Sequence, residues 1–225
     1  MNQIFNFLIE PYQNYAIIDV VLEAIAVILG LLSVYFAKRD QIAVYPTGML
    51  STIIFVYILF KANLLGDMII NAYYFLVSIY GWYFWSHKKE KKTENPISVM
   101  DPLEKKWWFI LFIIILFLIA GIYILFDKWN SWSAPIDCFT TGLFFIGMWF
   151  MARKRLEHWI FWIVGDIISI PLYLFKGLAL TSIQYFIFTL IAIFGYIQWK
   201  QIYNSKKVIV LESFYMVLSQ VEKQL

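Results

Sequence analysis

The sequence predicts an all-α integral membrane protein. We expect seven transmembrane helices in a 3+1+3 arrangement, with two parallel three-helix repeats on either side of one linking helix. The composition is 62% hydrophobic and 15% charged, whereas soluble domains hold roughly 45–50% apolar and about 25% charged residues. Seven apolar runs have about the 20 residues that cross a bilayer. The basic residues and a set of repeated motifs then order these runs.

The elements follow one another in a regular order. Residues 1–18 are mixed in character, and we expect a short interfacial segment there. The predicted spans that follow are about 19–37, 42–60, 65–85, 106–126, 134–152, 157–175 and 179–200. They divide the chain into a first three-helix bundle (19–85), a charged, mobile cytoplasmic linker (86–105), a linking transmembrane helix (106–126), a second three-helix bundle (134–200) and a cytoplasmic tail (201–225). In the tail, the stretch from Val208 is expected to form a separate amphipathic surface helix.

Basic residues alternate between the connecting segments. Fifteen of the 18 lysines and arginines fall in segments on one side of the predicted spans. The other side holds only Lys61, Lys128 and Lys176. Because cytoplasmic loops carry an excess of Lys and Arg, this pattern predicts an N-terminus outside and a C-terminus in the cytoplasm.

Short motifs recur between the first and last three spans. Ala37-Lys38-Arg39 is repeated as Ala152-Arg153-Lys154 at an offset of 115, and GWYFW (81–85) is repeated as GYIQW (195–199) at an offset of 114. Three spans plus one linking span place both copies in the same orientation. Parallel repeats of this kind are typical of transporters, whose substrate site lies at the repeat interface near the bilayer midplane.

The span 157–175 has one polar side. At 100° per residue, its polar and aromatic positions fall on one face: Trp159, Trp162, Asp166, Ser169 and Tyr173. A carboxylate facing lipid costs about 2.5–3.5 kcal/mol on insertion scales. Since Asp166 lies near the predicted midplane, we expect this face to line a cavity.

Two other spans contribute polar groups. One side of the span 65–85 carries Asp67, Asn71, Tyr74, Ser78 and Trp85, and the last span offers Thr181, Gln184 and Tyr185. The predicted substrate-binding residues are Trp159, Trp162, Asp166, Asn71, Gln184, Tyr74 and Tyr173.

Some of these residues have structural alternatives. Asn71 and Gln184 could equally bond neighbouring helices, and Trp159 could equally belong to an interfacial aromatic belt. Trp85 and Trp199 are interpreted as belt residues.

Enzyme chemistry finds little support in the sequence. No phosphate-binding loop or hydrolase motif occurs, and the single cysteine, Cys138, excludes a cysteine-based metal cluster. We therefore expect no catalytic residue, no metal, no cofactor and no nucleic-acid partner. Pores for anions usually supply basic residues, but no basic patch lies within the membrane, since Lys106 and Lys200 fall at the ends of their spans. Carboxylates, amides and indoles suit a flat, neutral or cationic ring compound with hydroxyl groups.

Three stretches resemble a known family. The pattern W-x-x-W-x-x-x-[N/D] at Trp159, Trp162 and Asp166, together with SIYGWYFW (78–85) and LTSIQYFIF (180–188), resembles the PnuC-type vitamin transporters over about residues 19–200. The resemblance implies facilitated diffusion of nicotinamide riboside by alternating access, and a homotrimer in the lipid membrane. A cytosolic kinase would trap the substrate without a required contact.

The resemblance also assigns residues and leaves alternatives open. Trp159, Trp162 and Asp166 would contact substrate from the sixth span, Gln184 from the seventh, and Asn71 occupies a place where many members have Gln. A thiamine transporter of the same family fits the same residues. Proton-coupled uptake through Asp166, or through Glu23 or Asp137 nearer the outer surface, is a further alternative.

Overall fold

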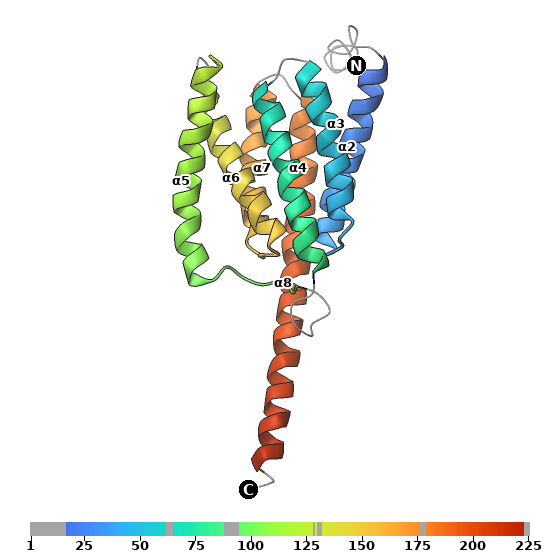
Figure 1. Ribbon diagram of the computed structural model, residues 1–225, viewed down its shortest axis with the longest axis vertical. Helices are drawn as coiled ribbons and strands as arrows, with labels where there is room; N and C mark the ends of the chain where they lie inside the picture. Colours follow the sequence, from blue (N-terminus) through green and yellow to red (C-terminus); the bar gives the residue numbers. More distant parts are fainter. Residues whose placement is uncertain are drawn as a thin grey trace.

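The computed structural model describes residues 17–61, 65–87, 95–127, 129, 132–175 and 179–222 of the 225-residue chain, without the side chains of residues 65–67, 179–181, 207 and 209–222. Within these ranges, every regular element is an α-helix: α2 (Ile17–Lys38), α3 (Val44–Lys61), α4 (Leu65–Ser86), α5 (Pro102–Leu125), α6 (Ala134–Ala152), α7 (His158–Phe175) and α8 (Ala179–Glu222). The helices run side by side in alternating directions (Figure 1). Each predicted span coincides with one helix to within a few residues, apart from the far end of α8.

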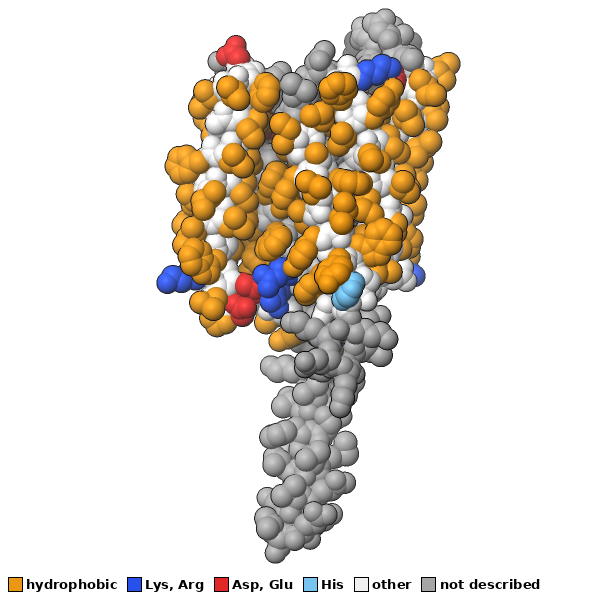
Figure 2. Space-filling view, viewed as in Figure 1, with side chains coloured by type: hydrophobic (Ala, Val, Ile, Leu, Met, Phe, Trp, Pro, Cys, Tyr) orange, Lys and Arg blue, Asp and Glu red, His pale blue; other side chains and the backbone are white. Residues whose placement is uncertain are grey.

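Six helical segments are long and apolar enough to cross a membrane: α2, α3, α5, α6, α7 and the part of α8 from Ser182 to Lys206. The helix α4 falls outside this group because its Tyr, Trp and Asn side chains lower its mean hydropathy, although it runs beside the others over a similar height (Figure 1). Figure 2 shows a broad hydrophobic belt with charged side chains gathered above and below it. The chain is therefore a multi-pass membrane protein.

The helices pack in two groups. In the first group α3 packs against α2 and α4, and in the second α7 packs against α6 and α8. The two groups meet where α2 lies against α8 and α4 against α6. The helix α5 packs against the outer side of α6, where Phe112, Ile115 and Ile119 are buried with Leu143 and Phe150.

Two tryptophans join the groups near the ends of α2, α4 and α6, and these helix ends lie at the lower side of the bundle in Figure 1. Trp85 Nε1 donates a hydrogen bond to the Ala152 carbonyl (3.2 Å). Trp199 Nε1 donates to the Ala37 carbonyl (2.8 Å). Both indoles are buried, so the interpretation of Trp85 and Trp199 as belt residues was wrong. Helical periodicity placed them near a membrane surface but could not show that the two groups enclose them.

The tight turns at this end have the same backbone form. Asp40, after α2, and Lys154, after α6, both have positive φ (55° and 54°). The Asp40 N–H donates to the Ala37 carbonyl and the Lys154 N–H to the Met151 carbonyl, each at 3.0 Å. Lys154 Nζ also forms an ion pair with Asp40 Oδ1 (2.8 Å) and is almost fully buried. The two turns therefore contact each other across the boundary between the groups.

The end of the predicted linker is fixed rather than mobile. Residues 88–94 lie outside the described residues, but Ser98 pairs with the turn between α6 and α7, since its N–H donates to the Lys154 carbonyl and its carbonyl accepts from Leu156. The helix α5 also begins four residues earlier than predicted, at Pro102. The Asp101 carboxylate accepts from the Glu104 N–H, and the Glu104 carboxylate accepts from the Asp101 N–H. This reciprocal pair is a capping box.

The tail differs from the prediction as well. The helix α8 runs without a break for 44 residues, or about 66 Å at 1.5 Å per residue. It projects below the other helices (Figure 1). Residues 208–222 are helical, as expected, but they continue the transmembrane helix instead of forming a separate surface helix. No Gly or Pro follows Gly195, so nothing in the backbone ends the helix.

Candidate functional site

The polar face of α7 borders a cavity of about 340 Å³ between the two groups of helices. Trp159, Trp162, Asp166 and Tyr173 line it. Ser169, the fifth residue of the predicted face, is fully buried and does not line it. The expectation that this face of α7 is turned toward a cavity is therefore confirmed for four of its residues.

Residues from the other predicted faces reach the same cavity. Asn71 and Tyr74 approach it from α4, and Gln184 from α8. All seven residues that the sequence selected thus line one space. The side chains of Asp67 and Thr181 lie outside the described residues. Of the two outer carboxylates, Asp137 lines the cavity, whereas Glu23 is not among the lining residues.

Asp166 is the most unusual group in the cavity. Its side chain is 2% exposed. Among the described residues, no hydrogen bond or ion pair reaches its carboxylate, and no Lys or Arg lines the cavity. A buried carboxylate without a partner is costly, so a group that supplies positive charge or hydrogen-bond donors would stabilise it.

Three aromatic rings that line the cavity with Asp166 lie against one another. The Phe144 ring is stacked with Trp162 (ring centroids 5.3 Å apart) and with Tyr185 (6.0 Å). Tyr74 lies tilted against Trp162 at 6.3 Å. We call Phe144, Trp162 and Tyr185 the aromatic face. Such rings offer π-surfaces to a flat or cationic ligand.

Sequence reasoning missed Phe144. It lies in an apolar stretch of α6, where nothing separates it from other phenylalanines. The signal that could have found it is Gly165, next to Asp166 in the chain. A Cβ atom at Gly165 would lie 2.3 Å from the Phe144 ring, so the glycine is what lets the ring reach the cavity.

Trp159 is buried between helices and does not face the surroundings. Its indole is 2% exposed and packs against His158 and Trp199, with centroid distances of 4.4 and 5.8 Å. A Cβ at Gly195 would meet the Trp159 ring at 2.6 Å. Trp159 Nε1 has no hydrogen-bond partner within the described part of the chain. The belt alternative is therefore excluded, and only part of the indole borders the cavity.

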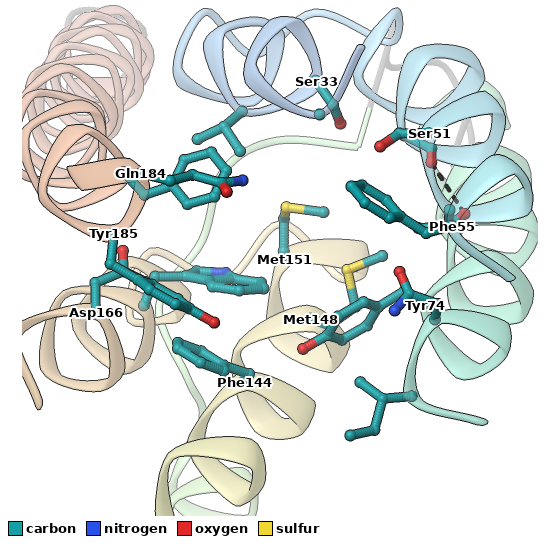
Figure 3. Close-up of a pocket in the computed structure, with 18 of the residues that line it drawn as sticks. Ser33, Ser51, Phe55, Tyr74, Phe144, Met148, Met151, Asp166, Gln184 and Tyr185 are labelled. Carbon is teal, nitrogen blue, oxygen red and sulfur yellow. Dashed lines mark hydrogen bonds between the residues drawn. The ribbon is translucent and has the colours of Figure 1, made fainter. Parts of the chain in front are cut away.

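Hydroxyl groups line the opposite side of the cavity. They belong to the first group of helices, and we call them the hydroxyl face: Ser33, Ser51, Thr52 and Ser78. Figure 3 shows Ser33 and Ser51 across the cavity from Asp166, Gln184 and Tyr185. Sequence reasoning selected none of these four as ligand contacts, because isolated Ser and Thr residues are common in transmembrane helices.

Comparison with known proteins identifies the family. The family model described as nicotinamide mononucleotide transporter matches residues 20–201. The chain belongs to this family. It is 25% identical over 201 residues to the nicotinamide riboside transporter PnuC of Escherichia coli (strain K12), covering 79% of this chain and 84% of that protein. The riboflavin/roseoflavin transporter RibM of Streptomyces davaonensis is 24% identical over 174 residues, 76% of this chain and 81% of RibM.

A solved structure shares the fold. The crystal structure of the vitamin B3 transporter PnuC superimposes with a TM-score of 0.59, at 23% identity, over 80% of this chain and 81% of that one. The resemblance carried by Trp159, Trp162 and Asp166 is confirmed at the level of the family. The chain is a PnuC-type membrane transporter of the vitamin class and not an enzyme.

Proposed function

We propose that this protein carries nicotinamide riboside across a bacterial inner membrane by facilitated diffusion. The observation that carries the proposal is Asp166, a buried carboxylate without a hydrogen-bond or ion-pair partner among the described residues, which lines the cavity together with the aromatic face. The riboside combines a flat pyridinium ring, a carboxamide and sugar hydroxyls. Each part has a matching group in the cavity.

The ring and its charge account for the aromatic face. A cation over an indole is worth about 2 kcal/mol or more when desolvated. Trp162, already stacked on Phe144, would stack on the pyridinium ring, and Trp159 would flank that ring. Asp166 would balance the charge or accept from the carboxamide, while Asn71, Gln184, Tyr74 and Tyr173 bond the polar substituents.

The cavity argues for the riboside over the mononucleotide. The family description names the mononucleotide, whereas the relatives are named for the riboside. A phosphate brings negative charge that proteins normally meet with Arg or Lys. No basic side chain lines this cavity within the described residues, and Asp166 would repel the phosphate. Phosphorylation by a cytosolic kinase would then trap the riboside after entry.

Transport would follow from two parallel repeats, α2–α4 and α6–α8, linked by α5 in a 3+1+3 arrangement. The reciprocal bonds of Trp85 and Trp199 support this, because the two donors lie 114 residues apart and their acceptors 115 apart. The matching turns at Asp40 and Lys154, also 114 apart, support it too. Rocking of one repeat against the other would open the cavity to each side in turn.

Basic residues support the orientation. The helices α2 and α6 both end at the lower side of the bundle in Figure 1. Lys38 is the last residue of α2 and Arg39 follows it, and the turn between α6 and α7 holds Arg153 and Arg155. Because basic residues favour the cytoplasmic side, we place this end and the C-terminus in the cytoplasm, with the N-terminus outside.

Competition binding tests the proposal. Purified protein in detergent is titrated with labelled nicotinamide riboside, and unlabelled mononucleotide, thiamine and riboflavin compete. We expect strong competition by the riboside alone. If the mononucleotide competes as well as the riboside, the charge argument is wrong. Thiamine is included because it is also a flat cationic aromatic, and riboflavin because RibM is a relative.

Coupling is tested separately in proteoliposomes. Facilitated diffusion predicts that internal riboside stops at the external concentration, with or without a pH gradient. Accumulation above that level, driven by an inward proton gradient and lost in Asp166→Asn, would replace this mechanism with proton-coupled uptake.

A further inference from the structure

The two sides of the cavity differ at matching positions of the two helix groups. At the offset of 114, Gly48 of α3 corresponds to Trp162 of α7, and Ser33 of α2 to Gly147 of α6. A Cβ at Gly48 would lie 2.9 Å from Ser33 Oγ, and a Cβ at Gly147 would lie 3.2 Å from Trp162 Nε1. The same pair of positions is therefore in contact in both groups. One pair holds a ring and the other holds none.

The missing ring leaves space against the hydroxyl face. Gly48 lines the cavity, and a Cβ there would lie 4.0 Å from Ser78 Oγ. A tryptophan at Gly48 would fill the space that Ser33 and Ser78 border. The glycine thus keeps one half of the cavity open for part of a ligand.

The hydroxyl groups in this half can bond a ligand. Ser33 Oγ donates to the Val44 carbonyl and Ser51 Oγ to the Ala26 carbonyl, each at 2.7 Å. Their oxygens keep lone pairs that can accept.

Ser78 has more capacity than these two. It is 3% exposed, and its hydroxyl makes no hydrogen bond within the part of the chain that the structure describes. It can therefore both donate and accept, as the hydroxyls of a sugar do.

We propose that the hydroxyl face binds the sugar of a ring-linked riboside, with Ser78 bonding a ribose hydroxyl and Gly48 reserving the space that the sugar occupies. The ring then lies on the aromatic face and the sugar points toward α2, α3 and α4. This inference rests on the proposed function. It adds that the first group of helices selects for the sugar, and it names two residues that do so.

A hydroxyl-deleted ligand tests the role of Ser78. Affinities are measured for nicotinamide riboside and, by competition, for its 2′,3′-dideoxy analogue, which keeps the ring and its charge. We expect the wild type to prefer the riboside. Ser78→Ala should weaken riboside binding about three- to tenfold, as one hydrogen bond is lost, and leave the affinity for the analogue unchanged. Ser86→Ala is the matched control, because its hydroxyl bonds the Trp82 and Tyr83 carbonyls and contacts His87 Nδ1 at the end of α4, and it does not line the cavity.

The outcomes separate the two proposals. If the wild type binds neither ligand, the proposed function fails. If it binds both equally, or if Ser78→Ala weakens both alike, the riboside remains the substrate but the sugar assignment is overturned.

An exchange between the groups tests Gly48. The double variant Ser33→Gly with Gly48→Trp reproduces the Gly147–Trp162 pair in the first group. We expect at least a tenfold loss of riboside affinity with an unchanged thermal unfolding midpoint in detergent. Should that variant fail to fold, Ser33→Gly with Gly48→Ala places one methyl group in the same space and should weaken riboside binding more than Ser33→Gly alone. Full riboside affinity in whichever of the two variants folds overturns the role of Gly48.

Discussion

The first group of helices, α2–α4, and the second, α6–α8, share backbone contacts but divide the binding chemistry between them. Both have the same tight turn, at Asp40 and at Lys154, and each sends one indole to a carbonyl of the other group. The side chains that line the cavity nevertheless differ between the two groups. The second group supplies Phe144, Trp162 and the buried carboxylate of Asp166 from α6 and α7. The first group supplies the small hydroxyl residues of the hydroxyl face beside Phe55 and Tyr74.

One pair of matching contacts, in which a large side chain occurs in one group only, shows how this difference arises. Gly30 of α2 lies against Ser51 of α3, since a Cβ at Gly30 would meet Ser51 Oγ at 3.2 Å. At the matching positions 114 residues later, Phe144 of α6 lies against Gly165 of α7. The contact is kept while the large side chain appears on one helix of the second group only. Contacts that hold the fold and groups that bind the ligand can therefore vary independently.

The largest expected effect concerns Asp166, which has no charged counterpart in the first group. We expect Asp166→Ala to weaken riboside binding about 30- to 100-fold, because a hydrogen bond to a charged group is worth roughly 1.5–3 kcal/mol. Isothermal titration calorimetry measures the affinity. The thermal unfolding midpoint should stay the same or rise, since an unpaired buried carboxylate is removed. Unchanged binding would mean that Asp166 does not contact the ligand.

The second-largest effect is expected when the Trp162 indole is removed from the aromatic face. Trp162→Ala should weaken binding about 30-fold, equivalent to roughly 2 kcal/mol of desolvated cation–π attraction, and Trp162→Phe should recover part of the loss. Trp132→Ala is the control, because that indole is mostly exposed and does not line the cavity. An equal loss in the control would show a general effect of removing an indole.

Two matching glycines separate stability from binding. A Cβ at Gly81 would meet Tyr45 at 2.3 Å, and one at Gly195 would meet Trp159 at 2.6 Å. Gly81→Ala and Gly195→Ala should each destabilise the protein by about 1–3 kcal/mol through overpacking, visible as similar falls in the unfolding midpoint. Only Gly195→Ala should also weaken riboside binding, because Trp159 borders the cavity and Tyr45 does not. Equal binding in the two variants would remove Trp159 from the site.

The smallest effect concerns the paired indoles. Trp85→Phe and Trp199→Phe each delete one hydrogen bond between the groups, worth about 0.5–1.5 kcal/mol. We expect similar, modest falls in the unfolding midpoint, followed by differential scanning fluorimetry in detergent. A much larger fall in one variant would show that the two bonds are not equivalent.

Hydropathy and helical periodicity determined much of this molecule. They located the helices and put Trp162 and Asp166 on one side of α7, because the side-chain direction within a single helix follows from its period. They also selected all seven predicted site residues, which the structure brings to one cavity. A carboxylate that faces lipid is so costly that the position of Asp166 within an apolar span already indicates a polar environment.

Only the tertiary structure decided which faces meet. It showed that Phe144 completes the aromatic face, that Trp85 and Trp199 lie between the groups, and that Ser78 faces the cavity. The helical period placed Ser78 and Trp85 on the polar side of α4, but it could not show what that side faces, because a residue has the same helical period wherever its helix is packed. Their roles depend on contacts between helices far apart in the chain, and on the glycines that set how closely those helices approach.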